Sequence, residues 1–184
     1  MQEYIDKNSG CIAPSLCKKW FRQATEAIAF LHSKGVIHSD TRPENFLVHA
    51  TSDSAEFPDI LICDFGGSMC REINIDGGHL PDPGFFNPTQ EDVSTPAIDI
   101  FSLGSIFYSI LTGHWPYSLP GSFMTLDERV IYGQNVDMLF EQKKFPDVGE
   151  LAGGKIVMNC WTKMYSTAEQ MLDSIDKEML IGDR

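Results

Sequence analysis

The chain reads HSDTRPEN at residues 38–45 and DFG at residues 64–66. The first stretch sets a carboxylate on Asp40, a cation on Arg42 and an amide on Asn45 within one short loop. Apolar residues that can form short strands follow this loop and precede DFG. Phosphoryl transfer requires groups that orient a hydroxyl, cations that neutralise phosphate charge, and oxygen ligands for a metal ion. The pattern therefore predicts phosphate chemistry around these residues.

Both stretches resemble protein kinase motifs, the catalytic loop H-R-D-x-x-x-x-N and the metal-binding D-F-G. Further motifs follow in the order of that family: DIFSLG at 99–104 and LTGHWPY at 111–117 resemble the landmarks around its central helix. The resemblance covers nearly the whole chain, which is identified as similar to the eukaryotic-type protein kinases. It implies a mainly α-helical C-terminal lobe, part of an α+β family fold, with a small β ribbon around the catalytic loop.

The resemblance also implies a role for each candidate site residue. Asp40 would act as the catalytic base for the substrate hydroxyl, and Arg42 would steady the transferring phosphate. Asn45 and Asp64 would bind Mg²⁺, which prefers oxygen ligands. The implied cofactors are ATP and Mg²⁺, and the implied partner is a protein whose Ser or Thr accepts the phosphate. The residues expected beneath the adenine are Leu47, supported by Ile106 and Ile110.

The order of motifs predicts one domain over residues 1–184. Within it we expect the catalytic loop at 38–45, the activation segment at about 64–90 and a buried central helix at about 98–111. Only about forty residues precede the loop, and they contain no G-x-G-x-x-G, no V-A-I-K-like lysine and no partner glutamate. We therefore expect a truncated kinase domain that is weak or inactive alone, with an N-terminal lobe or a partner protein supplied elsewhere.

Two other functions stay open at this point. A pseudokinase or docking module would use the helical lobe as a binding surface without catalysis, and the missing upper lobe favours it. The presence of Asp40, Asn45 and Asp64 argues against a deliberate loss of catalysis. A small-molecule phosphotransferase similar to aminoglycoside or choline kinases shares an H-x-D…N…D arrangement. Those enzymes usually lack D-F-G, S-L-G and L-T-G-x-x-P in this order.

Composition narrows the class of protein and its partners. The 184 residues are 42% hydrophobic, which is ordinary for a folded domain. The formal net charge of −12 argues against nucleic acid or an acidic membrane as partner. Five cysteines without C-x-x-C spacing indicate reduced thiols. We expect an intracellular, cytoplasmic protein, with a nuclear location left open.

Periodicity predicts the main elements. Ser15 is expected to cap a helix with apolar residues at helical spacing as far as Leu31, and Gly35 is expected to end it. A short strand at 36–37 then enters the loop, and residues 49–57 form a hairpin loop. Beyond the central helix we expect two or three helical pieces, separated at Pro120-Gly121 and at Pro146.

Some positions depart from the family pattern. Ser39 replaces the arginine of H-R-D, so a phosphate-triggered switch loses its main receiver. The A-P-E motif reads NPT at 87–89, and Tyr165 aligns with the arginine that usually pairs with its glutamate, so both charges of one buried ion pair are replaced. The threonine usually found early in the substrate loop is absent, and Asp82 lies near its place. His38 is interpreted as a structural residue that packs near Phe65 and is tied to Asp99.

Overall fold

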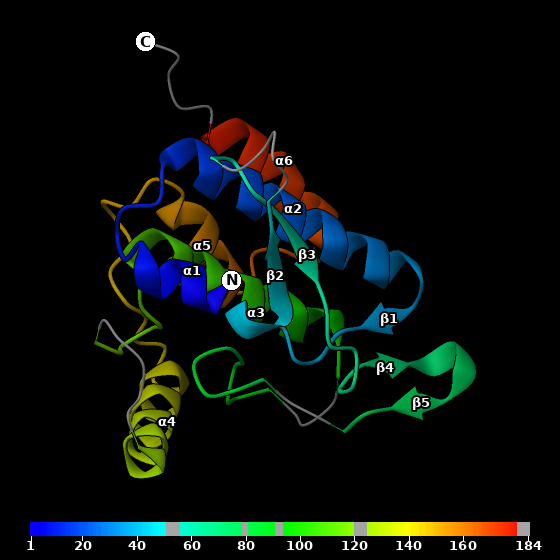
Figure 1. Cartoon of the computed structure of the whole chain (residues 1–184). Helices are drawn as coiled ribbons and strands as arrows, with labels where there is room; N and C mark the ends of the chain where they lie inside the picture. Colours follow the sequence, from blue (N-terminus) through cyan, green and yellow to red (C-terminus); the bar gives the residue numbers. More distant parts are fainter. Residues whose placement is uncertain (51–55, 79–80, 91–93, 120–124, 180–184) are drawn as a thin grey trace.

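The computed structural model describes residues 1–50, 56–78, 81–90, 94–119 and 125–179. It is mainly helical, as the sequence predicts, with short strands grouped near the predicted catalytic loop (Figure 1). The elements in chain order are α1 (Gln2–Lys7), α2 (Pro14–Ser33), β1 (Val36–Ile37), η1 (Pro43–Asn45), β2 (Phe46–His49), β3 (Asp59–Ile62), β4 (Met69–Cys70), η2 (Arg71–Ile73), β5 (Ile75–Asp76), α3 (Pro96–Thr112), α4 (Leu126–Glu141), α5 (Gly154–Trp161) and α6 (Ala168–Glu178).

Helix α3 is the centre of the core, and it contains the central helix expected at about 98–111. Every residue from Ile98 to Ile110 is buried. Helices α2 and α5 pack against α3, and α6 packs along α2 (Figure 1). Helix α3 approaches α5 closely at Gly104, where an added Cβ would lie 2.7 Å from the Cβ of Cys160. Only glycine therefore permits this packing of α3 against α5.

Helix α2 confirms the predicted periodicity but not the predicted cap. It begins at Pro14, and Ala13 at the N-cap position makes no side-chain hydrogen bond. The prediction of Ser15 as the cap is wrong, because proline fits the first helical position and starts the helix earlier. At the other end, Gly35 has φ of +69°, the left-handed conformation expected after the last turn.

Two small antiparallel sheets surround the loop. Strand β2 pairs with strand β3, and Leu47 lies opposite Leu61 in this pair. Residues 51–55 of the predicted hairpin loop lie outside the described ranges. Strand β1 pairs with β4, and β4 pairs with β5. The predicted activation segment thus contains regular structure that its sequence does not reveal. Backbone pairing forms these strands while β5 stays exposed, so no alternation of apolar residues marks it.

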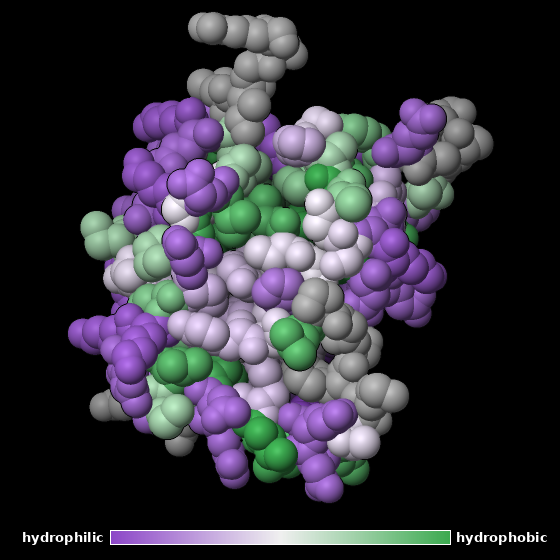
Figure 2. Space-filling model, turned by 90° about the vertical axis from the view of Figure 1, so that its left-hand side faces the viewer, coloured by the Kyte–Doolittle hydropathy of each residue, from purple (hydrophilic) through white to green (hydrophobic). Residues whose placement is uncertain are grey.

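Residues 125–179, the described part of the last third, contain helices α4, α5 and α6. Pro146 lies between α4 and α5 as predicted, while Pro120-Gly121 falls outside the described residues. Helix α4 stands apart from the other helices (Figure 1) and begins with a capping box between Thr125 and Glu128. None of the helices in the described ranges is long and apolar enough to cross a membrane. Figure 2 shows one face on which separate hydrophobic patches alternate with hydrophilic ones.

Candidate active site

The predicted catalytic loop is held from beneath by Asp99. Its fully buried carboxylate accepts hydrogen bonds from the backbone N–H groups of His38 (2.9 Å) and Ser39 (3.0 Å). It also accepts from the Thr41 hydroxyl (2.9 Å) and lies 2.9 Å from Nε2 of His32. Charge-assisted bonds of this kind are stronger than neutral ones. Helix α3 therefore fixes the backbone of the loop through one side chain.

Asp40 and Asn45 meet within the loop. The Asn45 amide donates to the backbone carbonyl of Asp40 (2.7 Å) and to its Oδ2 (2.9 Å). Both side chains belong to buried residues, with Asp40 7% exposed. Because both partners are acceptors, the nitrogen of the amide must face Asp40, and its oxygen points the other way. The 3₁₀ turn η1 supplies the close spacing that allows this contact.

Arg42 lies between two carboxylates. Its Nε is 3.5 Å from Oδ1 of Asp40, and its Nη1 pairs with Oδ2 of Asp82. The same Asp82 oxygen accepts from Nη2 of Arg129 in α4. Burial disfavours the charged form of Arg42, but Asp82 and Asp40 outweigh it and raise the pKa of Arg42. The cation is thus fixed beside Asp40 and tied to the predicted activation segment.

Asp64 lies next to this loop but in a different environment. The preceding Cys63 binds the loop from both sides, because its N–H donates to the Asn45 carbonyl (2.9 Å) and its carbonyl oxygen lies 3.1 Å from Nε2 of His38. Asp64 itself is exposed, with φ of +61°, and its Oδ1 accepts from the N–H of Gly66 at 3.3 Å. Its carboxylate is available to solvent.

The donor set of this region suits Mg²⁺. The Asn45 amide oxygen makes no hydrogen bond within the described part of the chain, and the Asp64 carboxylate is exposed. Mg²⁺ usually takes one or two protein oxygen ligands and completes its shell with water and phosphate oxygens. These two residues fit that pattern. Within the described ranges, no group of three or more His, Cys, Asp or Glu side chains forms a cage for a metal ion.

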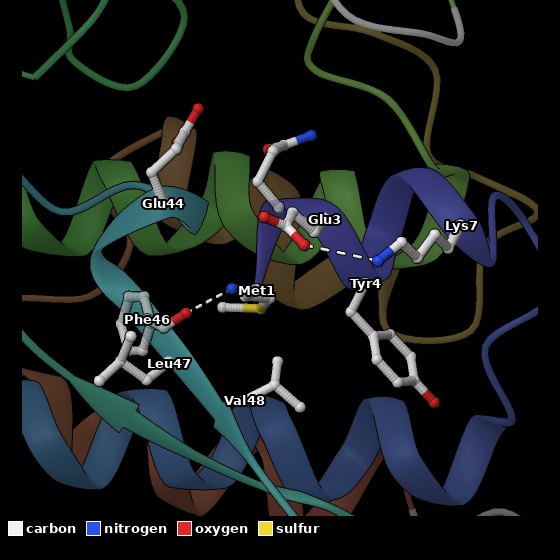
Figure 3. Close-up of a pocket in the computed structure, with 9 residues that line it drawn as sticks. Met1, Glu3, Tyr4, Lys7, Glu44, Phe46, Leu47 and Val48 are labelled. Atoms are coloured by element: carbon white, nitrogen blue, oxygen red, sulfur yellow. Dashed lines mark hydrogen bonds and ion pairs between the residues drawn. The ribbon is translucent and has the colours of Figure 1, made fainter.

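Leu47 lines a pocket of about 530 Å³ between α1 and β2 (Figure 3). Its side chain is 55% exposed, and Val48, Tyr4 and Glu44 also border the space. Ile106 and Ile110 are fully buried in α3 and do not line the pocket, so they support it only through the core.

The terminal ammonium of Met1 also borders this pocket and donates to the carbonyl of Phe46. Its burial lowers the pKa of this ammonium.

The structure adds residues that sequence reasoning missed. Arg129 joins the site through Asp82, 47 residues away, and no local pattern could indicate this. His32 pairs with Asp99, 67 residues away in sequence, and no local pattern could indicate this contact either. The predictions for His38 are confirmed: its ring centroid lies 5.2 Å from that of Phe65, and its backbone N–H donates to Asp99.

Two departures from the family pattern are resolved locally. The Ser39 hydroxyl donates to Oγ of Ser94 at 2.7 Å in a buried contact. In the family pattern this position is an arginine that receives a phosphate. Tyr165 is buried, and its hydroxyl lies 3.3 Å from the amide nitrogen of Asn159, which donates to it. Thr89 bonds to its neighbour Asn87. Thr89 and Tyr165 stand where the family has a glutamate and an arginine, and both are uncharged. This agrees with the joint loss of that buried ion pair.

The family to which the chain belongs is now clear. Residues 1–175 match the protein kinase domain family, and the chain belongs to it. It is 35% identical to serine/threonine-protein kinase chk-2 of Caenorhabditis elegans over 127 residues, which cover 67% of this chain and 26% of that protein. It is 34% identical to calcium/calmodulin-dependent protein kinase type 1 of Caenorhabditis briggsae over 98 residues, 52% of this chain and 27% of that protein.

The relatives are serine/threonine kinases, and the chain spans about a quarter of their length. CBL-interacting serine/threonine-protein kinase 26 of Arabidopsis thaliana shares 29% identity over 143 residues, 72% of this chain and 30% of that protein. The fold is similar to a solved structure of the Rad53 kinase domain and SCD2 in complex with AMPPNP. That match has a TM-score of 0.64 at 20% identity and covers 94% of this chain and 62% of the other.

Proposed function

We propose that this lobe carries the catalytic loop and the substrate side of a kinase that transfers the γ-phosphate of ATP to Ser or Thr of a protein. The observation that carries the proposal is the contact of Asn45 with Asp40 above the buried Asp99 carboxylate. Three groups of the phosphoryl-transfer pattern are fixed in one loop, and such preorganisation is the main requirement of this chemistry.

Each residue has a distinct task in the proposal. The Asp40 carboxylate orients the substrate hydroxyl and takes its proton, and the Arg42 guanidinium stabilises charge on the transferring phosphoryl group. Asn45 and Asp64 hold Mg²⁺ through oxygen atoms. Bound Mg²⁺ supplies neutralisation of the charge that develops on the phosphates. Leu47 gives an apolar surface beneath the adenine.

The nucleotide-gripping half of the site must come from outside these residues. Leu47 and Leu61 are each more than half exposed on the paired strands β2 and β3, and Asp64 is exposed beside them. Water reaching the phosphates from this side would weaken electrostatic stabilisation, which is usually the largest catalytic contribution. We infer that the chain alone has little or no activity, and that an N-terminal lobe from a longer chain or a partner protein completes the site.

The test is Mg²⁺-dependent transfer from labelled ATP to a generic basic protein, using the folded chain with Asp40→Asn and Asp64→Ala as controls. We expect no transfer above that of the controls from this chain alone. Transfer that both substitutions abolish in a chain extended by an upper lobe would support the assigned roles. Transfer from this chain alone that both substitutions abolish would contradict the inferred inactivity, and transfer that survives Asp40→Asn would contradict the role of Asp40.

A second candidate function is a docking module without catalysis. The exposed apolar residues of β2 and β3 favour it, since they form a surface that another protein can cover. The assay on an extended chain separates the two functions. A folded, nucleotide-binding extended chain that transfers no phosphate would favour the docking module.

A further inference from the structure

A second pocket lies far along the chain from the loop, where the ends of α4 and α5 meet the segment at 87–89. Its volume is about 750 Å³, within the range of ligand pockets in proteins. The residues before and after each helix end supply its walls, and none of the residues that line it is Asp or Glu. We call it the α4–α5 pocket.

The floor of the α4–α5 pocket is aromatic. The rings of Phe145 and Trp161 are stacked, with centroids 5.5 Å apart and planes 12° apart. The ring of Phe140 contacts both, at 5.4 Å from Phe145 and 5.8 Å from Trp161. The Trp161 N–H donates to Ser105 in the core at 2.9 Å, so its polar group is satisfied on the inner side. Trp161 and Phe140 are each only 2% exposed, so the apolar surface that the floor offers to a bulky apolar side chain comes from the partly buried Phe145 and Met158 that lie over them.

The rim of the pocket is cationic. Lys143, Lys144 and Lys163 line it, and all three are exposed. Within the described part of the chain none of the three forms an ion pair, which is also true of Lys18, Lys34 and Lys177, so it is their gathering at one pocket that distinguishes them. The formal net charge of the whole protein is −12. Three uncompensated cations at one apolar pocket are thus a local reversal of the charge of the molecule.

A structural explanation accounts for only part of this arrangement. Lys143 and Lys163 follow the last turns of α4 and α5, where cations interact favourably with the helix dipole. Both have left-handed backbone conformations, with φ of +55° and +58°, which favour glycine or asparagine instead. The dipole does not explain why the two lysines converge with Lys144 on one aromatic floor. Lys177, in the last turn of α6, lines none of the pockets described above.

We propose that the α4–α5 pocket binds an acidic peptide segment of a partner protein, with one bulky apolar side chain on the aromatic floor and flanking carboxylates at the three lysines. Charge complementarity selects this occupant, because an acidic segment is repelled by most of the molecule and attracted here. Asn87 and Thr89 lie at the end of the predicted activation segment. The bound acidic peptide would therefore lie beside the path of the substrate. The idea that the partner is a substrate rests on the proposed function. The binding of an acidic peptide to this pocket does not depend on it.

The first test is binding without nucleotide. A fluorescent peptide with Asp and Glu flanking one phenylalanine is titrated with the folded chain, and its anisotropy is measured. We expect saturable binding that weakens about tenfold when the phenylalanine is replaced by serine, and that weakens further as salt screens the charges. A peptide with Lys in place of the acidic residues should not bind. Kinase activity is not needed, so failure of the proposed function leaves this result intact.

The second test uses substitutions that do not endanger the fold. Lys143→Asn with Lys163→Asn removes two charges and inserts a residue that accepts left-handed backbone. We expect the double variant to unfold at the same or a higher denaturant concentration, and to bind the acidic peptide about tenfold more weakly. Lys177→Asn removes one charge outside the pocket and should leave binding unchanged.

Three results would overturn the proposal. The first is no binding of the acidic peptide up to about 1 mM, the weak end of specific affinities. The second is equal binding of the phenylalanine-free peptide, which would indicate general charge attraction. The third is an equal loss of affinity in Lys177→Asn and in the double variant, because the pocket would then have no special role.

Discussion

The two carboxylates of the proposed chemistry, Asp40 and Asp64, are 24 residues apart in sequence and differ sharply in environment. Asp40 is buried and bonded by Asn45, above the Asp99 carboxylate. Asp64 is exposed, with a left-handed backbone and a bond only from Gly66 among the described residues. The lobe thus fixes the half of the site that faces its own core. The half that faces outward depends on whatever covers β2 and β3.

The largest expected effect concerns Asp99, which holds the Asp40 half of the site. We expect Asp99→Ala to lower the free energy of unfolding by about 3 kcal/mol, because it leaves buried donors of His38, Ser39 and Thr41 without an acceptor. Urea unfolding followed by circular dichroism measures the change. Asp99→Asn keeps one acceptor oxygen and should cost clearly less. Equal losses in the two variants would show that the hydrogen bonds do not hold the loop.

The contrast between the two halves can be sharpened with a matched pair of alanine substitutions. Asn45→Ala should cost about 1.5 kcal/mol of stability, since it removes a buried hydrogen-bonded amide. Asp64→Ala should cost less, about 0.5 kcal/mol, and that cost comes from placing alanine in left-handed backbone (φ +61°) rather than from a lost buried contact. Both are measured by urea unfolding. Equal costs would mean that the Asp64 half is as well fixed by this lobe as the Asp40 half.

The last test concerns Ser39, where the expected cost is smaller than at Asn45. Ser39→Ala should cost about 1 kcal/mol, because the bond to Ser94 is lost while the left-handed backbone, with φ of +65°, remains. Ser39→Gly loses the same bond but relieves the strained backbone, so its cost should be less than half as large. Thermal unfolding of the two variants tests this order. A glycine variant no more stable than the alanine variant would contradict it.

Sequence reasoning reached the parts of the molecule that local pattern governs. The spacing of apolar residues predicted the bounds of α2 and α3 to within a few residues. The order of the motifs predicted the position of the loop at 38–45. The ion pairs of Asp82 with Arg42 and Arg129 could not be predicted, since they join segments 40 and 47 residues apart. Strands β4 and β5 were missed because backbone pairing defines them, β4 with β1 and β5 with β4, and no alternation of buried side chains marks them.

Gly104 connects the packing of the core to the precision of the site. Asp99 and Gly104 are five residues apart on α3, about 7.5 Å along the helix axis. Because Gly104 touches α5 so closely, it sets the height at which Asp99 meets the loop. Any missense change of its codon adds a side-chain carbon and pushes the two helices apart. Inherited variation at position 104 would therefore damage the loop from a position buried in the core.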